Sequence, residues 1–113
     1  MIARLLGLAT VSPAELLPLV RAGRVTVLDV NPRSSWASAR VPGARHADPD
    51  AFGPEALPAD KASTVVFYCS NPMCTKAPRA AKRAEKMGYG DVRVLSAGIR
   101  GWLAARLPVE SGD

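Results

Sequence analysis

A short apolar run, a polar loop and an alanine-rich segment follow one another in the middle of the chain. Residues 65–68 are β-branched or aromatic and carry no charge, which is typical of a strand buried on both faces of a parallel sheet. The chain turns polar at Cys69 and passes through a Ser-Asn-Pro turn. Thr75 is the expected N-cap of a helix over 76–87, which Gly88 ends. The pattern predicts a strand, a loop that begins at a cysteine, and a helix.

The rest of the chain alternates between strand-like and helix-like segments. Ser12 and Glu15 predict a capping box, and the helix that follows should run to about Ala22 with a bend at Pro18. Such alternation is typical of an α/β domain with a mainly parallel sheet, whose ligands bind at the carboxyl ends of the strands, where Cys69 is placed. The other expected elements are an edge strand or ordered arm at 2–11, strands at 25–30, 45–47 and 91–95, a helical turn at 33–40 with Trp36 packed inward, a loop with one turn at 48–61, and a helix at 99–106.

The composition is that of one ordinary globular domain. The chain has 113 residues, of which 48% are hydrophobic and 22% charged, enough for one core and too apolar for general disorder. We expect a single domain over 1–113, with a core at about 11–107 and terminal arms at 1–10 and 108–113. The apolar start at 1–9 is too short to cross a membrane and has no convincing cleavage pattern. A cytoplasmic protein that does not bind membranes is predicted.

The net charge and the number of cysteines limit which partners, metals and cofactors are expected. Fifteen Lys and Arg against ten Asp and Glu give a net charge of +5, which favours small anionic substrates or acidic protein partners. Only two Phe, two Tyr and two Trp are present, without the interleaving of basic and aromatic residues that nucleic-acid binding needs. Two cysteines without a CxxC pair, beside one histidine, do not make a zinc site. We predict no metal, no cofactor and no nucleic acid, and cysteines that are catalytic or redox-active.

Cys69 is the first candidate for chemistry. It is expected between a strand end and a helix N-terminus, where free backbone N–H groups and the helix dipole favour negative charge. Such a setting can lower a cysteine pKa from ~8.5 to roughly 3.5–7.5, so one hypothesis is a reactive thiolate in an anion-binding loop. The alternative is a buried, inert cysteine at a strand end. The local pattern leaves both open.

Two polar residues of the strand-like segments invite a functional interpretation. Asp29 must be paired or hydrogen-bonded inside its apolar strand, and we interpret it as structural. His46 is the only histidine and therefore the candidate general base for a cysteine. Nothing in the sequence places it near Cys69, so a packing or surface role is favoured.

Four short segments stand in a characteristic order. They read VLDV at 27–30, RVPGA at 40–44, FYC at 67–69 and VLSAGIRGW at 94–102. They resemble the LDV strand, the HIPGA turn, the strand with the active-site cysteine and the hxGGhxxW segment of the single-domain rhodanese-like family. The resemblance covers about 11–107 and implies a three-layer α/β domain, with a mainly parallel five-stranded sheet flanked by helices.

The same resemblance implies a sulfurtransferase. In that family the cysteine thiolate, here Cys69, takes the outer sulfur of a small anionic donor such as thiosulfate and becomes a persulfide. The sulfur then passes to cyanide, a thiol or a protein acceptor. A monomer or weak dimer is expected. The anion would be held by backbone N–H groups of the loop formed by Ser70, Asn71, Pro72, Met73, Cys74 and Thr75.

The loop departs from the family pattern Cys-x-x-Gly-x-Arg-Ser. Pro72 and Cys74 replace the Gly and the Arg, which weakens the case for an ordinary thiosulfate site. Lys76 and Arg79 in the following helix can supply the missing charge or face solvent, and the sequence favours neither. Asn31 stands where many members have an arginine, which removes one partner from the aspartate two residues before it.

Cys74 keeps a second function open. This thiol can attack a Cys69 persulfide or sulfenate and close a disulfide, as in a dithiol redox sensor or an arsenate-type reductase, or it can simply fill the place of the arginine. A phosphatase would need Cys-x5-Arg, but the arginine position is Thr75 or Ala80, depending on which cysteine is counted from. A non-catalytic binding module is the third alternative, although such domains usually lack the cysteine.

Overall fold

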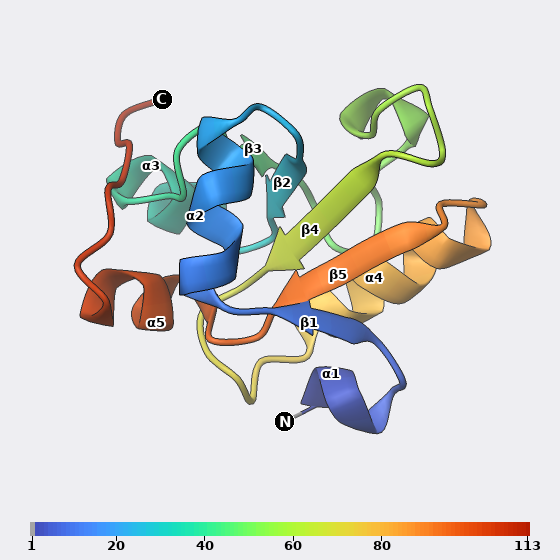
Figure 1. Cartoon of the computed structure of the whole chain (residues 1–113), viewed down its shortest axis with the longest axis horizontal. Coiled ribbons are helices and arrows are strands. Elements are labelled where there is room, and N and C mark those ends of the chain that lie inside the picture. Colours follow the sequence, from blue (N-terminus) through green and yellow to red (C-terminus); the bar gives the residue numbers. More distant parts are fainter. Residues whose placement is uncertain (1) are drawn as a thin grey trace.

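Parallel strands form the central layer of the structure (Figure 1). The computed structural model describes residues 2–113. Five strands lie in the order β1-β5-β4-β2-β3, and each neighbouring pair among the described residues is parallel, which confirms the expected fold class. Because β4 is the central strand, the cysteine that follows it lies in the middle of the carboxyl edge. The strands are β1 (Ala9–Val11), β2 (Thr26–Asp29), β3 (Arg45–His46), β4 (Thr64–Tyr68) and β5 (Asp91–Leu95).

Helices cover both faces of the sheet. In Figure 1, α4 lies behind the sheet, α2 lies in front of it, and α1 lies below β1 next to the loop that follows β4. The capping box of α2 is confirmed: the Glu15 N–H donates to Ser12 Oγ at 3.1 Å, and the Ser12 N–H donates to Glu15 Oε1 at 2.9 Å. No helix within 2–113 is long and apolar enough to cross a membrane. The helical elements are α1 (Ile2–Leu5), α2 (Pro13–Arg21), α3 (Arg33–Ser38), η1 (Pro54–Ala56), α4 (Lys76–Lys86) and α5 (Gly98–Ala104).

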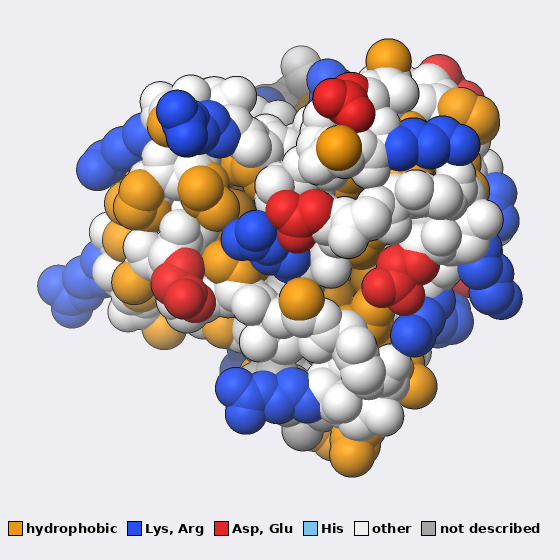
Figure 2. Space-filling view, turned by 45° about the vertical axis from the view of Figure 1, so that its right-hand side comes forward, with side chains coloured by type: hydrophobic (Ala, Val, Ile, Leu, Met, Phe, Trp, Pro, Cys, Tyr) orange, Lys and Arg blue, Asp and Glu red, His pale blue; other side chains and the backbone are white. Residues whose placement is uncertain are grey.

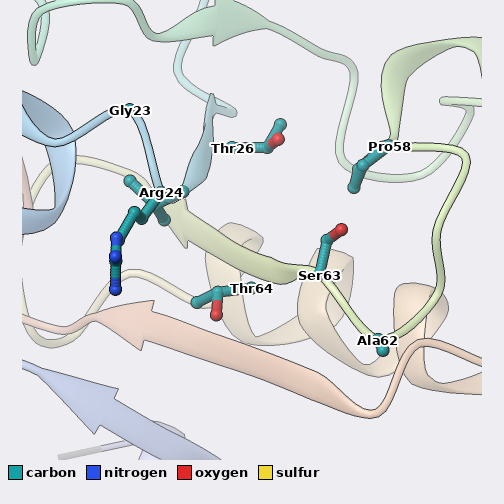
Figure 3. A pocket seen from close by; sticks show the side chains of 8 residues that line it. Gly23, Arg24, Thr26, Pro58, Ala62, Ser63 and Thr64 are labelled. Carbon is teal, nitrogen blue, oxygen red and sulfur yellow. The ribbon is translucent and has the colours of Figure 1, made fainter.

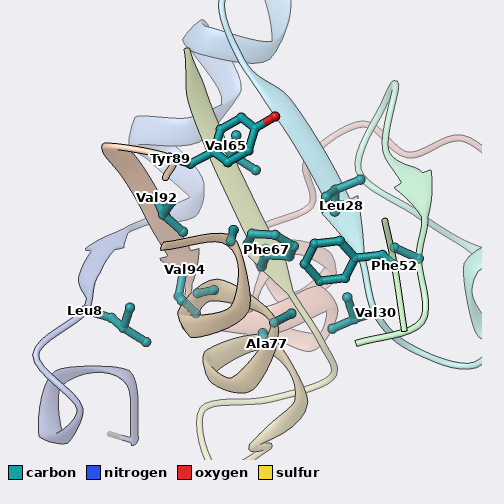
Figure 4. Packing of buried hydrophobic residues seen from close by; sticks show 14 of the residues in the cluster. Leu8, Leu28, Val30, Phe52, Val65, Phe67, Ala77, Tyr89, Val92 and Val94 are labelled. Carbon is teal, nitrogen blue, oxygen red and sulfur yellow. The ribbon is translucent and has the colours of Figure 1, made fainter. Parts of the chain in front are cut away.

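Alternation along β4 divides the core between the two faces and orients Cys69. Val65 and Phe67 pack with the buried alanines of α4, whereas Val66 and Tyr68 pack with residues of α2 and α5. Figure 4 shows the first of these clusters, in which Phe52 stacks beside Phe67 with ring centroids 5.5 Å apart. Since Cys69 continues the odd-numbered face, its side chain belongs to the α4 side of the sheet.

Three expectations are corrected. Segment 2–11 is not one strand or arm but helix α1 followed by strand β1. Trp36 is half-buried rather than packed inward. The group that covers its ring is the Arg40 guanidinium, which lies 4.0 Å from the ring centroid. Thr75 does not cap α4 with its side chain: the residue is already helical, and its hydroxyl accepts a hydrogen bond from Arg79 instead.

Candidate active site

The first residues of the cysteine loop are held by the start of α5. The Ile99 N–H donates to the Cys69 carbonyl at 3.0 Å, and the Arg100 N–H donates to the Ser70 carbonyl at 3.1 Å. Gly98 makes this approach possible, since its φ is +67° and a Cβ there would lie 2.5 Å from the Ser70 carbonyl. The segment after β5 therefore fixes the backbone from which the Cys69 side chain projects.

The two cysteine side chains face each other across the loop. Both thiols are free; Cys69 is buried and Cys74 half-buried. The two side chains line the same small hollow, and each shifts the pKa of the other. Folding thus brings together the two thiols that lie five residues apart in the sequence, as a dithiol device requires.

Ionisation of the pair differs from the expectation of a Cys69 thiolate. Burial raises the pKa of Cys69 to about 12, and its hydrogen bond to Cys74 acts in the same direction. The backbone N–H groups of Ala77 and Ser70 point at the Cys69 sulfur and favour the thiolate, but they do not outweigh burial. In the resting dithiol, Cys69 keeps its proton.

At the start of α4, the pKa of Cys74 is lowered. Burial opposes ionisation of this thiol as well, but the interactions with Cys69 and with the Lys76 and Ser70 N–H groups favour the thiolate. The anion-stabilising effect expected for this position therefore acts on the second cysteine. Of the two thiols, Cys74 loses its proton first.

The ring of N–H donors also differs from the expected run over 70–75. The Met73 N–H donates to Asn71 Oδ1 at 2.9 Å, and the Cys74 N–H donates to the Asn71 carbonyl at 3.1 Å, so both point away from the sulfurs. The donors that reach the sulfurs come from Ser70 and from the first turn of α4, including Ala77, which the sequence reasoning missed. The sequence signal that could have identified Ala77 was the helix start itself, because the first N–H groups of a helix have no partner within the helix.

Asp29 connects β2 to β4 and to the segment that follows β2. The side chain is fully buried, and Oδ2 accepts a hydrogen bond from the Tyr68 hydroxyl at 2.6 Å while Oδ1 accepts one from the Asn31 N–H at 2.8 Å. The Tyr68 oxygen in turn accepts the Val41 N–H at 3.1 Å. Burial raises the pKa of Asp29, although both hydrogen bonds oppose that rise. The structural interpretation of Asp29 agrees with these contacts.

His46 makes its hydrogen-bond contact with the chain just after β2. Its Nε2 lies 2.8 Å from the Asn31 carbonyl oxygen, a contact that joins the end of β3 to the segment that follows β2. Among residues 2–113 no three His, Cys, Asp or Glu side chains gather as metal ligands would. The favoured packing role of His46 agrees with this geometry.

A family model, the rhodanese-like domain, matches the chain over residues 12–105. The chain belongs to the rhodanese-like domain family. This family includes sulfurtransferases: the human single-domain sulfurtransferase TSTD1 superposes with a TM-score of 0.71 at 27% identity, covering 84% of this chain and 95% of that one.

Curated relatives differ in their stated functions. Arsenate reductase 2.2 of Oryza sativa subsp. japonica is 31% identical over 114 residues, which cover 91% of this chain and 88% of that protein. An HTH-type transcriptional regulator of Mycobacterium tuberculosis is also 31% identical, over 102 residues. They cover 90% of this chain but 45% of the regulator, so the rhodanese-like domain spans less than half of that protein.

Lys76 and Arg79, for which the sequence left open a charge role or a solvent-facing position, make no hydrogen bond to the sulfurs within the described residues. Arg79 is bound by Asp50, with Nε–Oδ1 and Nη2–Oδ2 distances of 3.1 and 2.9 Å. Lys76 lies beside a hollow of about 180 Å³ next to the ends of β2 and β3, which Arg33 and His46 also line. Pro72 and Met73 are exposed on the outer part of the loop. The rhodanese-like domain thus retains the loop position but has a second thiol in place of a guanidinium.

Access to the thiols is restricted by α1. The hollow beside Cys69 and Cys74 measures about 10 Å³, room for about one water molecule, and Ala3 of α1 forms part of its wall. Ala3 is 2% exposed and Cys69 is 3% exposed. A molecule larger than water fits beside Cys69 only after α1 or the outer loop moves.

Another hollow lies at the opposite end of the sheet and is not a catalytic candidate. It measures about 370 Å³ and is lined at the amino ends of β2 and β4 by Gly23, Arg24, Thr26 and Thr64, among others (Figure 3). Arg24 is the one charged side chain among its lining residues, and no thiol or carboxylate joins it. The chemistry of this rhodanese-like domain is therefore assigned to the carboxyl edge.

Proposed function

We propose that the protein is a sulfurtransferase that carries a sulfane sulfur as a persulfide on Cys69. The observation that supports this most is the place of Cys69, which is buried at the carboxyl end of the central strand and packs with Ala77 of the first turn of α4. Both a thiolate and a persulfide anion need N–H donors in a water-poor site, and the start of a helix supplies them. The family, and the likeness to a human sulfurtransferase, support the same class.

Both thiols take part in converting Cys69 to a nucleophile. The Cys69 proton passes along its hydrogen bond to the Cys74 sulfur, which leaves Cys69 as the thiolate nucleophile. The thiolate attacks the outer sulfur of thiosulfate, a new S–S bond forms, and sulfite leaves with the electron pair of the broken bond. An acceptor, either cyanide, a thiol or a protein thiolate, then attacks the outer sulfur and Cys69 leaves as thiolate.

The proposed persulfide is tested by intact mass. The reduced protein is treated with thiosulfate and compared with Cys69→Ser and Cys74→Ser. We expect wild type to gain one sulfur atom and Cys69→Ser to gain none. Addition of cyanide should remove the sulfur and release thiocyanate. Absence of an adduct with thiosulfate and with small persulfide donors, in wild type and in Cys74→Ser, would contradict the proposal.

The contact between the cysteines favours a second candidate, a dithiol reductase of an oxyanion such as arsenate. Cys69 would bond to arsenic with loss of water, and Cys74 would attack the Cys69 sulfur. The S–As bond breaks, arsenic leaves with the electron pair as arsenite, and the two thiols become a disulfide that an external thiol must reduce. The rice arsenate reductase, which this chain matches over most of its length, supports this candidate.

The two candidates give different products. Arsenate should convert wild type to a disulfide with loss of two hydrogens, and Cys74→Ser should not form it. If arsenate leaves both thiols free while thiosulfate yields the persulfide, the reductase candidate fails. Both candidates need free thiols, and we propose the cytoplasm, a reducing compartment, as the place of action.

A further inference from the structure

A basic hollow lies between α1 and α4, next to the cysteine loop. It measures about 360 Å³. Four basic side chains and one acidic side chain line it, a surplus of three positive charges in a chain whose total surplus is five. In Figure 2, which brings forward the side that carries the end of α4, basic side chains are frequent along the right-hand edge. The lining residues are Leu6, Asp50, Arg79, Lys82, Arg83 and Lys86.

The charges of this basic hollow differ in how far they are already neutralised. Arg79 is paired with Asp50, and Arg83 donates to the Phe52 carbonyl at 3.0 and 2.9 Å. Lys82 has an exposed partner at 3.4 Å one turn along the helix, a type of pair that contributes little. Lys86 makes no ion pair within the described residues. The two lysines are therefore the charges available to a partner.

Exposed apolar side chains accompany the lysines. Leu6, in the wall of the basic hollow, is 45% exposed, and its neighbour Leu5 is 83% exposed. Ala3, three residues before Leu6, borders the cysteines, so a partner seated on Leu6 lies near the helix that covers Cys69. The hollow joins an apolar side chain to a cationic rim, an arrangement typical of protein interfaces.

We propose that this surface docks an acidic, leucine-bearing segment of a protein that accepts the sulfur carried by Cys69. The identity of the cargo rests on the proposed sulfurtransferase function, whereas the docking does not. Basic positions extend from Arg79 to Lys86, about 10 Å along α4, which suits a peptide segment better than one small oxyanion. None of the six lining side chains is aromatic, so bases have no stacking surface.

Binding is tested on the reduced, sulfur-free protein by fluorescence anisotropy. The probe is a short fluorescein-labelled peptide of glutamate, aspartate and leucine, and a second peptide carries glutamine and asparagine at the acidic positions. We expect the double variant Lys82→Glu and Lys86→Glu to weaken binding of the acidic peptide about tenfold or more, because attraction becomes repulsion at the rim. Leu6→Ser should weaken it severalfold.

A matched variant controls for general charge. Arg21→Glu with Arg24→Glu changes the net charge equally, on exposed positions at the end of α2 and before β2. It should change binding by less than about twofold. Equal losses in the two double variants, or equal binding of the uncharged peptide, would overturn the docking surface. Tighter binding of an oligouridylate, lost with the Lys82 and Lys86 reversals, would assign the surface to nucleic acid instead.

A second experiment measures sulfur transfer from the Cys69 persulfide to a cysteine-tailed form of the acidic peptide. Docking predicts faster transfer to this peptide than to its uncharged form, with the advantage lost in the Lys82 and Lys86 double variant. If the persulfide never forms, the proposed function fails while the anisotropy result still decides the docking. If the persulfide forms and the acidic peptide does not bind, the docking proposal fails alone.

Discussion

Tyr68→Phe tests the buried contact that ties β2, β4 and the turn before β3 together. Removing the hydroxyl deprives two buried groups of their partner, the Asp29 carboxyl oxygen at 2.6 Å and the Val41 N–H at 3.1 Å. Each unsatisfied buried group costs about 1–3 kcal/mol, so the free energy of unfolding should fall by roughly 2–6 kcal/mol. For a chain of this size that corresponds to a Tm lowered by roughly 8–24 °C.

Tyr89→Phe is the matched control for this prediction. Its hydroxyl donates one hydrogen bond of the same length, 2.6 Å, to the Pro58 carbonyl. Loss of that bond should cost about 0.5–1.5 kcal/mol. Both variants and wild type are compared by urea denaturation followed by circular dichroism. A Tyr68→Phe cost no larger than that of Tyr89→Phe would refute the reasoning that two groups depend on this hydroxyl.

The hydrogen bond between Tyr68 and Asp29 should also affect how the stability of the fold depends on pH. The folded pKa of Asp29 is raised, so the fold binds its proton more tightly than the unfolded chain does. The stability that this tighter proton binding contributes is fully present below the pKa of Asp29 in the unfolded chain. It is lost as pH rises through the pKa of Asp29 in the folded protein. Asp29→Asn should remove this part of the pH dependence. Tyr68→Phe should enlarge it, because the hydroxyl that favours the carboxylate is gone.

Three further predictions concern the cysteine loop. At neutral pH iodoacetamide should label Cys74 before Cys69 in wild type, because the pKa of Cys74 is lowered and that of Cys69 raised, as peptide mapping can show. Gly98→Ala should lower the free energy of unfolding by about 1–3 kcal/mol or more through its positive φ and the clash with Ser70, measured in urea. Deletion of residues 2–6 should speed labelling of Cys69 severalfold, since Ala3 no longer covers it.

Each of these predictions has a clear contrary result. Labelling of Cys69 first would mean that the proton resides on Cys74. A Gly98→Ala protein as stable as wild type would show that the start of α5 does not fix the loop. Unchanged labelling after the deletion, in a protein whose circular dichroism shows a folded sheet, would mean that access is limited by the outer loop rather than by α1.

The elements of the fold were largely predictable because their signals are local. The charge-free run at 65–68 and the Ser12 capping box each depend on a few adjacent residues. Cys69 could be singled out as a candidate because its position at a strand end follows from the same pattern, and the structure places it there, buried.

Ionisation of the site was not predictable, since it depends on which side chains meet. The hydrogen bond between Cys69 and Cys74 and the burial of Cys69 decide where the proton lies, and neither can be derived from spacing. The position of the two sulfurs also explains why Thr75 does not cap α4 with its side chain. The first N–H groups of α4 are directed at the two sulfurs, so the threonine hydroxyl is left to accept from Arg79.

Helix α1 lies outside the stretch, 12–105, that defines the family. Two proteins that share that whole stretch can therefore differ in how readily a reagent reaches the nucleophile, depending on what precedes it. For protein engineers, this makes residues 2–6 the segment to vary when reagent access to Cys69 is to be changed. A labelling experiment on residues 12–105 alone would test a protein that lacks both this helix and the edge strand β1.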